Sequence, residues 1–334
     1  MLQRTIYCAL TLSLFLSAND GSSASSPVSG VLVDDATASI RPLVGDSGSA
    51  HAGDASVSDV QYALAAPDGR TALVVRDDRI SVIRRVQTQM PVWRDLTDDR
   101  IEDRISVDRA IWSQDSNALA IYDAAQAKLF FWKNAQSDPA PAGRFDMSQF
   151  PSAPASLALD PEARYVFATF LEREGANLVV IPVGGAAQTL LTLSRPGAMF
   201  LSDGTLYIAD RGRAEVYALS NWTTGLTLRT IVAAGNGIRD PAGIALSPDG
   251  KQLYVADAGS RQVIAFELGS SEQKAAVQLD FRPTRMDLIA GGSLFLLDKG
   301  SRGESPAEVL QAPDLQVFHV PVGAADAPVP QDEQ

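Results

Sequence analysis

A repeat built only of short strand-like pieces limits the fold of this chain more than any other sequence feature. Its clearest copy runs from Pro241 to Leu268 and holds three apolar pieces rich in Val, Ile, Tyr and Phe. The turn-like segments Ser247-Pro248-Asp249-Gly250 and Asp257-Ala258-Gly259-Ser260 separate these pieces. Short apolar pieces bounded by Gly, Pro and Asp are typical of β-strands.

The same plan occurs in six copies along the chain. The first-turn positions are Asp68, Asp115, Glu162, Asp203, Asp249 and Gly291, with spacings of 47, 47, 41, 46 and 42 residues. An all-β repeat of this length is the signature of a β-propeller with four strands per blade. Weaker fourth strands are expected at 91–96, 143–147, 187–193, 226–233 and 275–281.

The last copy, residues 286–320, ends before a fourth strand and carries an insertion at 299–314 between its second and third strands. The strand-like segment 39–44 is expected to supply the missing strand and so to close the ring by joining the two chain ends. Pro42 suits an outermost edge strand, because proline cannot donate a ladder hydrogen bond. The sequence therefore predicts six four-stranded blades, and seven remain possible if residues 25–56 form more than one strand.

The N-terminal residues 1–24 have the pattern of a signal peptide. Arg4 precedes an apolar run at 6–16, and Ser22-x-Ala24 fits a cleavage site, with Ala18 as a second candidate. The run is too short for a transmembrane helix, which needs about 20 apolar residues. The expected divisions are a signal peptide at 1–24, an N-terminal segment at 25–56, a propeller at 57–320 and a disordered tail at 321–334. The mature protein is expected outside the cytoplasm, secreted or periplasmic.

Charge and cysteine content exclude several classes of function. The chain has 40 acidic and 28 basic residues, a formal net charge of -12, which argues against nucleic acid or an anionic membrane surface as partner. Cys8 is the only cysteine and lies in the signal peptide. The mature chain is therefore expected to lack disulfides, thiol catalysis and thiolate metal sites.

Two of the copies resemble a known repeat type. PGAMFLSDGTLYIADRGRAEVYAL at 196–219 and PAGIALSPDGKQLYVADAGSRQVIAFEL at 241–268 are similar to NHL and YVTN-type propeller repeats. The resemblance implies the propeller architecture across residues 57–320. Propellers of this kind include binding scaffolds, gluconolactonase-like hydrolases, strictosidine synthase-like enzymes and peptide-amide lyases, and the repeat does not choose among them.

Residues with catalytic or metal-binding chemistry are few. His51 and His319 are the only histidines, and neither has a ligand at short metal-binding spacing. No Gly-x-Ser-x-Gly nucleophile elbow is present. No cofactor is predicted, and a divalent cation is left open. The aspartates that end second strands, at 77, 123, 210, 257 and 298, are interpreted as side chains that close turns onto backbone N–H groups.

The loops that lead into the innermost strands provide the best candidate site. In a propeller these loops surround one mouth of the central channel. They hold charged residues of both signs, which could bind a small polar ligand or a carboxylate through arginine. These channel-mouth candidates are Asp59, Asp108, Arg109, Arg195, Arg239, Asp240, Arg282 and Arg285.

Two functions fit these features. The first is an exported binding or scaffold protein that recognises a protein, peptide or glycan through one propeller face. The alternative is a propeller enzyme of the gluconolactonase-like or lyase type with a metal at the central channel. The shortage of Asn and His among the channel-mouth residues favours the binding protein, and whether the chain is an enzyme stays open.

Overall fold

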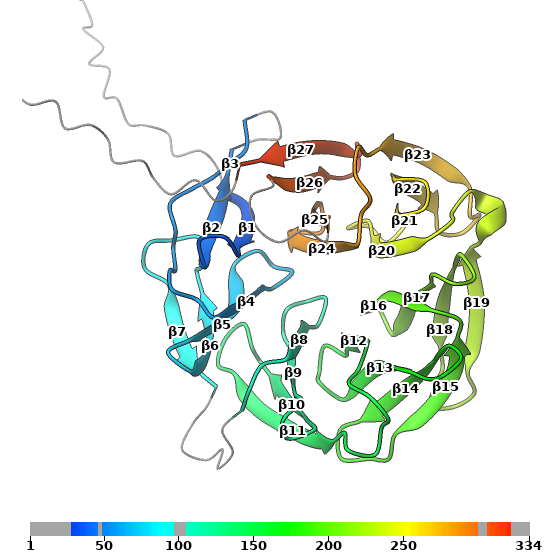
Figure 1. The fold of residues 1–334 in the computed structure, drawn as a ribbon, viewed down its shortest axis with the longest axis horizontal. Helices are drawn as coiled ribbons and strands as arrows, with labels where there is room; N and C mark the ends of the chain where they lie inside the picture. Colours follow the sequence, from blue (N-terminus) through cyan, green and yellow to red (C-terminus); the bar gives the residue numbers. More distant parts are fainter. Residues whose placement is uncertain (1–27, 46–48, 97–104, 300–305, 322–334) are drawn as a thin grey trace, which may run out of the picture.

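The chain folds into a β-propeller of seven antiparallel sheets arranged in a ring (Figure 1). The computed structural model describes residues 28–45, 49–96, 105–299 and 306–321. These residues form 27 strands and one short 3-10 helix, η1 (Ala234–Asn236). The all-β propeller expected from the repeat is confirmed, with the larger of the two blade numbers that the sequence allows.

The first four sheets run from the N-terminal strands to the middle of the chain. The first contains β1 (Val28–Asp34), β2 (Ser39–Val44) and β3 (His51–Ala52). The second contains β4 (Tyr62–Ala65), β5 (Thr71–Arg76), β6 (Arg79–Arg84) and β7 (Val92–Asp95). The third contains β8 (Arg109–Trp112), β9 (Leu119–Asp123), β10 (Lys128–Lys133) and β11 (Ala140–Asp146). The fourth contains β12 (Ser156–Leu159), β13 (Tyr165–Leu171), β14 (Ala176–Pro182) and β15 (Gln188–Leu193).

The remaining three sheets each have four strands. The fifth contains β16 (Pro196–Ser202), β17 (Thr205–Asp210), β18 (Glu215–Ser220) and β19 (Thr227–Val232). The sixth contains β20 (Pro241–Leu246), β21 (Gln252–Asp257), β22 (Gln262–Glu267) and β23 (Gln273–Gln278). The seventh contains β24 (Arg285–Ala290), β25 (Leu294–Asp298), β26 (Ala307–Gln311) and β27 (Gln316–Val320).

The core consists of layers between neighbouring sheets. The middle strands are apolar on both faces, so that β9, β21 and β22 are buried along nearly their whole length. Each face of a sheet therefore packs against the next sheet, and one hydrophobic cluster fills each of the seven interfaces. This double burial explains why these strands read as continuous apolar runs instead of alternating with polar residues.

The outermost strands have a different character. The first four residues of β19 and the first four residues of β23 are exposed. The pairing of the third strand with the fourth contains a register shift in four consecutive sheets, the third to the sixth. Bulges of this kind twist an edge strand and oppose pairing with the edge of another molecule.

The first sheet corrects the expected closure of the ring. Segment 39–44 is a strand, β2, but it pairs with β1 and β3 in its own sheet and not with the last blade. The last blade completes its own fourth strand, β27, because residues 307–311 form its third strand, β26, where an insertion was expected. The N-terminal residues thus close the ring as a separate blade.

The structure also explains why the repeat appears only six times in the sequence. Asp34 at the end of β1 pairs with Ser39 five residues later, as Asp210 pairs with Glu215 at the end of the second strand β17. Gly30, near the start of β1, lies against Ile289 near the end of β24, so the two strands run in opposite directions. We conclude that β1 occupies the place of a second strand. The first sheet, as far as it is described, therefore lacks the first turn by which the repeats were counted.

Two of the expected segments lie outside the described residues. The signal peptide at 1–24 is one, and all but Pro321 of the tail at 321–334 is the other. Within the described ranges, no helix has the length and apolar character needed to cross a membrane.

Close approach of neighbouring inner strands gives a test of the packing. A methyl group at Gly243 in β20 would lie 2.6 Å from Cβ and 2.8 Å from the backbone nitrogen of Met286 in β24. We expect Gly243→Ala to lower the free energy of unfolding by about 1–3 kcal/mol, measured by urea denaturation. Gly235→Ala is the control, because a Cβ there has no heavy atom within 4 Å. Equal stability of the two variants would contradict this contact.

Candidate functional site

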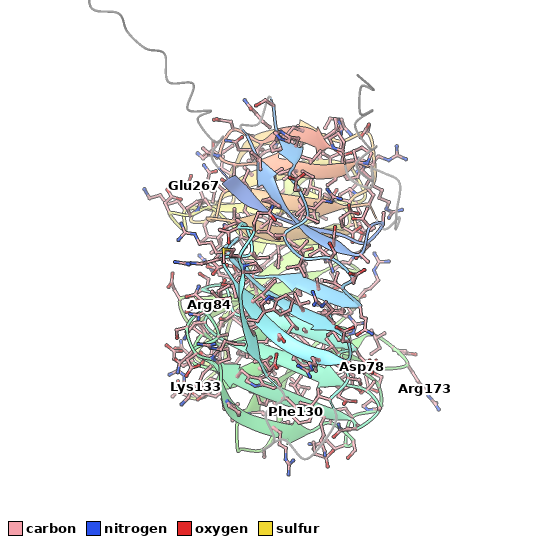
Figure 2. All side chains as sticks on the ribbon, turned by 90° about the vertical axis from the view of Figure 1, so that its left-hand side faces the viewer. Asp78, Arg84, Phe130, Lys133, Arg173 and Glu267 are labelled. Carbon is pink, nitrogen blue, oxygen red and sulfur yellow. The ribbon has the colours of Figure 1, made fainter. Side chains whose placement is uncertain are left out.

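The propeller has two faces that differ in the loops they carry. Figure 2 shows Asp78 and Arg173, from turns between second and third strands, on one side of the ring. Arg84, Lys133 and Glu267, at or near the ends of third strands, lie on the opposite side. Because strands alternate in direction, the first side also carries the loops that lead into the first strands. We call this side the mouth face, and all eight channel-mouth candidates belong to its loops or to the adjoining strand ends.

Buried aspartates at the ends of second strands fix the loops of the mouth face. The Asp210 carboxylate accepts hydrogen bonds from the backbone N–H groups of Ser194 (2.7 Å) and Arg195 (3.0 Å). It also accepts from Gly212 and Arg213 in its own turn. A carboxylate that bridges two loops in this way holds the backbone that carries Arg195 on the rigid part of the blade.

The next blade repeats this arrangement. The Asp257 carboxylate accepts from the N–H groups of Arg239 (3.0 Å) and Asp240 (2.5 Å), and from Ser260 in its turn. Asp123 does the same for Ser106 and Gln126. The interpretation of the repeated aspartates as turn-closing residues is confirmed for Asp123, Asp210 and Asp257. Asp77, by contrast, is 84% exposed and lies 3.6 Å from Arg76.

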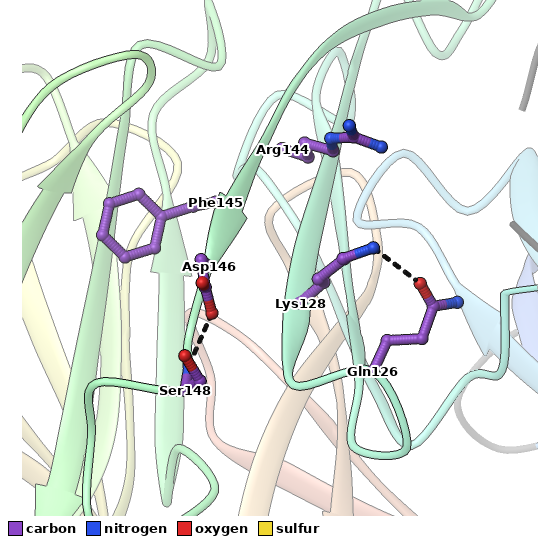
Figure 3. Close-up of a pocket in the computed structure, with 6 residues that line it drawn as sticks. All are labelled: Gln126, Lys128, Arg144, Phe145, Asp146 and Ser148. Atoms are coloured by element: carbon purple, nitrogen blue, oxygen red, sulfur yellow. Dashed lines mark hydrogen bonds between the residues drawn. The ribbon is translucent and has the colours of Figure 1, made fainter.

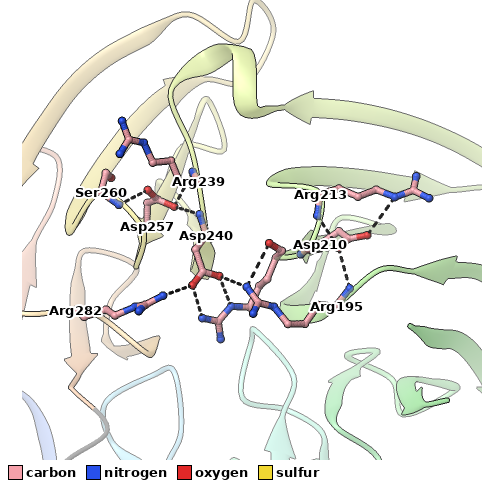
Figure 4. Close-up of polar contacts among 10 residues, drawn as sticks. Arg195, Asp210, Arg213, Arg239, Asp240, Asp257, Ser260 and Arg282 are labelled. Atoms are coloured by element: carbon pink, nitrogen blue, oxygen red, sulfur yellow. Dashed lines mark hydrogen bonds and ion pairs between the residues drawn. The ribbon is translucent and has the colours of Figure 1, made fainter. Parts of the chain in front are cut away.

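The Asp240 side chain lies at the centre of a cluster of three arginines. Arg211 donates from Nε to Oδ1 (2.7 Å) and from Nη2 to Oδ2 (2.9 Å), a bidentate contact. Arg195 donates to Oδ1 (2.9 Å) and Arg282 to Oδ2 (2.8 Å). Figure 4 shows Arg195 and Arg282 approaching Asp240 from opposite sides. Four residues from three consecutive blades, the fifth to the seventh, thus meet at one carboxylate.

The electrostatics of this arginine cluster are unbalanced toward positive charge. Hydrogen bonds from Arg211, and then from Arg282, hold the pKa of Asp240 at about 2 although burial opposes ionisation. Asp240 is therefore ionised at neutral pH. Three guanidinium charges against one carboxylate leave two positive charges in excess, in a protein whose formal net charge is -12.

The two outer arginines have unused donors that face solvent. Their side chains are 58% exposed for Arg195 and 63% exposed for Arg282, whereas Arg211 is 26% exposed. A guanidinium carries five N–H donors. Within the described residues, Arg195 uses only Nη2, toward Asp240 and the Arg211 carbonyl oxygen, and Arg282 uses only Nη2. The cluster can therefore bind a carboxylate, phosphate or sulfate group without losing Asp240.

A second charged pair lies on the first strand of the last blade. The Nε of Arg285 is 2.5 Å from Oδ2 of Asp287, and its Nη2 is 3.9 Å from Asp298. The surrounding protein raises the pKa of Asp287, an effect that Arg285 only partly offsets, although 40% of the side chain stays accessible to solvent. Burial also raises the pKa of Tyr62, whose hydroxyl lies near Arg285 and Arg109. The Arg285–Asp287 pair and Tyr62 therefore make the innermost strands β24 and β4 partly polar.

The eight candidates from the sequence have different places in this geometry. Arg195, Asp240 and Arg282 meet in the arginine cluster, and Arg285 joins the second pair. Arg239 is exposed on the same face, and Figure 4 shows its side chain directed away from Asp240. The other three lie outside both groups: Asp108 accepts from the Ala124 N–H (2.7 Å), Arg109 donates to the Ala155 carbonyl (3.4 Å), and Asp59 is exposed.

Sequence reasoning missed Arg211, Asp287 and Tyr62. Arg211 directly follows Asp210 in the turn between the second and third strands of its blade. These turns share the mouth face with the loops into the first strands, and that shared position is the signal that identifies Arg211 as a candidate. Asp287 and Tyr62 lie within inner strands, β24 and β4, and no local pattern separates them from other half-buried strand residues.

A hollow of about 270 Å³ on the third blade is lined by Gln126, Lys128, Arg144, Phe145, Asp146 and Ser148 (Figure 3). Its polar groups already have hydrogen-bond partners, since Lys128 donates to Gln126 (3.1 Å) and Asp146 accepts from the Ser148 N–H (2.9 Å).

Among the described residues, no three His, Cys, Asp or Glu side chains form a metal-binding group.

Comparisons with known proteins support the architecture. No family model matches this chain, and no curated protein matches it. Hydrazine synthase of Kuenenia stuttgartiensis is similar in structure, with 12% identity and a TM-score of 0.51 over 89% of this chain and 99% of that chain. A functionally unknown protein from Desulfotomaculum acetoxidans is similar at 15% identity and a TM-score of 0.50, over 75% of this chain and 78% of that chain. At these identities the likeness concerns the fold alone.

The depressed pKa of Asp240 predicts how stability depends on pH. The carboxyl has a pKa of about 2 in the folded protein and about 3.9 when unfolded, so ionisation stabilises the fold by about 2–3 kcal/mol above pH 5. This stabilisation is lost as the pH falls through the folded pKa. We expect Asp240→Asn to unfold at lower urea concentration than the unaltered protein at pH 7 and at nearly the same concentration near pH 2.

The control for this prediction is Asp59→Asn, which alters an exposed carboxylate of the same face. It should leave the urea midpoint unchanged at both pH values. An Asp240→Asn variant as stable as the unaltered protein at pH 7 would show that the three arginines do not stabilise the fold through this carboxylate.

Proposed function

We propose that this protein is an exported β-propeller that binds a protein, peptide or glycan through its mouth face, holding an anionic group of that partner on Arg195 and Arg282. One observation carries the proposal: three guanidinium groups share a single buried carboxylate and leave a positive excess on the surface. The structural comparisons agree with a propeller fold, which is used by proteins of many functions.

The arrangement suits recognition more than structural pairing alone. Arg211 donates one hydrogen bond to each carboxylate oxygen of Asp240, so this pair alone already gives both oxygens a donor. Arg195 and Arg282 add one bond each and keep most of their donors toward solvent. Arginine binds carboxylate and phosphate through paired N–H groups, and such charge-assisted hydrogen bonds are among the stronger polar contacts in proteins.

The export part of the proposal is supported by the sequence of residues 1–24. The repeat type we propose is NHL or YVTN, supported by the Pro-Asp-Gly turn and the Leu-Tyr-Val-Ala-Asp strand of the sixth sheet. That turn folds as its composition indicates, with Ser247 donating to Asp249 (2.6 Å) and Gly250 at a φ of +68°.

Ligand binding can be tested with citrate, a small polycarboxylate, by isothermal titration calorimetry at low ionic strength. Arg195→Ala and Arg282→Ala should each weaken citrate binding by about tenfold or more, since a hydrogen bond to a charged group contributes about 1.5–3 kcal/mol. Arg239→Ala removes an exposed arginine of the same face that does not contact Asp240, and it should bind citrate like the unaltered protein. Equal affinity of all four proteins would refute the site.

Export can be tested by isolating the protein from the medium or the periplasmic fraction and sequencing its N-terminus. Cleavage after Ala24 would give Ser25 as the first residue, and cleavage after Ala18 would give Asn19. Recovery in the cytoplasm with residues 1–24 intact would overturn this part of the proposal.

A further inference from the structure

The Asp240 carboxylate separates the two exposed arginines of the cluster. Nη2 of Arg195 lies 2.9 Å from Oδ1 and Nη2 of Arg282 lies 2.8 Å from Oδ2, and the two side chains approach from opposite sides (Figure 4). These two nitrogens are therefore at most about 8 Å apart, the span of two hydrogen bonds and one carboxylate. Each oxygen also accepts from Arg211, so both of its lone pairs are used.

A single anionic group is poorly placed to bridge Arg195 and Arg282. Asp240 occupies the space between their Nη2 atoms, and its pKa of about 2 keeps the carboxylate ionised at neutral pH. An anion that entered this space would meet a like charge at close range, which costs free energy. Each arginine is therefore expected to bind an anionic group of its own, through the N–H donors that Asp240 leaves unused.

The charge of the cluster also fits two anionic groups. Three guanidinium groups and one carboxylate leave two positive charges in excess. The excess lies outward, because the side chains of Arg195 and Arg282 are 58% and 63% exposed whereas that of Arg211 is 26% exposed. One anionic group would leave the cluster positive, and two neutralise it. The ligand is therefore expected to carry two acidic groups at a spacing close to that of the two arginines.

Acidic side chains two positions apart on an extended peptide have this spacing. Alternate residues of a strand point to the same side and lie about 7 Å apart, whereas neighbouring residues point to opposite sides. We infer that the arginine cluster binds an extended peptide with acidic residues at positions i and i+2, one held by Arg195 and the other by Arg282. This inference rests on the proposed function, because it names the ligand class of the same site.

The test compares three synthetic peptides on the unaltered protein, by isothermal titration calorimetry at low ionic strength. The diacidic peptide is acetyl-Ala-Asp-Ala-Asp-Ala-amide, the monoacidic peptide has Asn in place of the second Asp, and the adjacent-acid peptide is acetyl-Ala-Asp-Asp-Ala-Ala-amide. We expect the diacidic peptide to bind about tenfold more tightly than the monoacidic one, because it gains a second charge-assisted contact. The adjacent-acid peptide has the same net charge as the diacidic one but should bind within about threefold of the monoacidic one.

Two variants test whether the second acidic group is held by the arginine cluster. In Arg282→Ala, the diacidic and monoacidic peptides should bind within about twofold of each other, because only one outer arginine remains to accept an acidic group. Arg239→Ala is the matched control, since it removes an exposed arginine of the same face that is directed away from Asp240. This control should keep the tenfold difference between the two peptides.

The outcomes separate this inference from the proposed function. Equal affinity of the diacidic and monoacidic peptides, with both weakened by Arg195→Ala, would overturn the inference and leave the proposed site intact. Equal affinity of the diacidic and adjacent-acid peptides would show that total charge decides instead of spacing, which also overturns it. Tighter binding of trigalacturonate than of the diacidic peptide would overturn the assignment to a peptide. Peptide and citrate binding that neither Arg195→Ala nor Arg282→Ala changes would overturn the proposed function as well.

Discussion

The fold depends on middle strands that are apolar on both faces. A sheet with one polar face can leave that face exposed to solvent. The sheets that contain β9, β21 and β22 need a neighbouring sheet on each side, because the side chains on both faces of these strands are apolar and must be removed from water. Sheets of this kind can be stacked without an exposed end only by closing into a ring. The seven interface clusters are the result, and every loop of the mouth face is positioned by the closure they impose.

The buried aspartates connect this packing to the site. Asp210 and Asp257 are fully shielded from solvent, and each ties an incoming loop to the end of a second strand through backbone N–H groups. The anchors hold Arg195 and Asp240 by their backbone N–H groups, and the two side chains meet each other in the arginine cluster. The position of this cluster therefore follows from two anchors in adjacent blades, with Arg282 supplied by the next blade.

The architecture could be predicted from the sequence because each blade repeats the same local signals. Short polar or glycine-containing turns between apolar runs marked the first and second strands in six blades, and the expected fourth strands are present within a few residues of their predicted bounds. The first blade could not be counted, because β1 begins at the position of a second strand. Leu315 to Val320 was taken as a third strand, because the shorter apolar piece at Val309–Leu310 was assigned to an insertion.

The site was predictable only in part. The face and three members of the arginine cluster followed from the rule that loops into first strands share one side of a propeller. The sequence did not show which of the charged residues are in contact. Arg211 and Asp240, for example, are 29 residues apart and lie in neighbouring blades, so their contact depends on the angle between these blades. Side-chain packing at the interface between two blades sets this angle, and the sequence pattern of one repeat does not describe that interface.

The absence of a shared strand between the first and last described sheets has an evolutionary consequence. Within the described residues each sheet is formed by one stretch of chain, and the first and last sheets pack together through side chains such as Leu32, Ile289 and Val309. Duplication or deletion of one stretch therefore adds or removes a whole blade without leaving any strand unpaired. Blade number in this architecture can change by a single genetic event, and the ring only has to readjust its curvature.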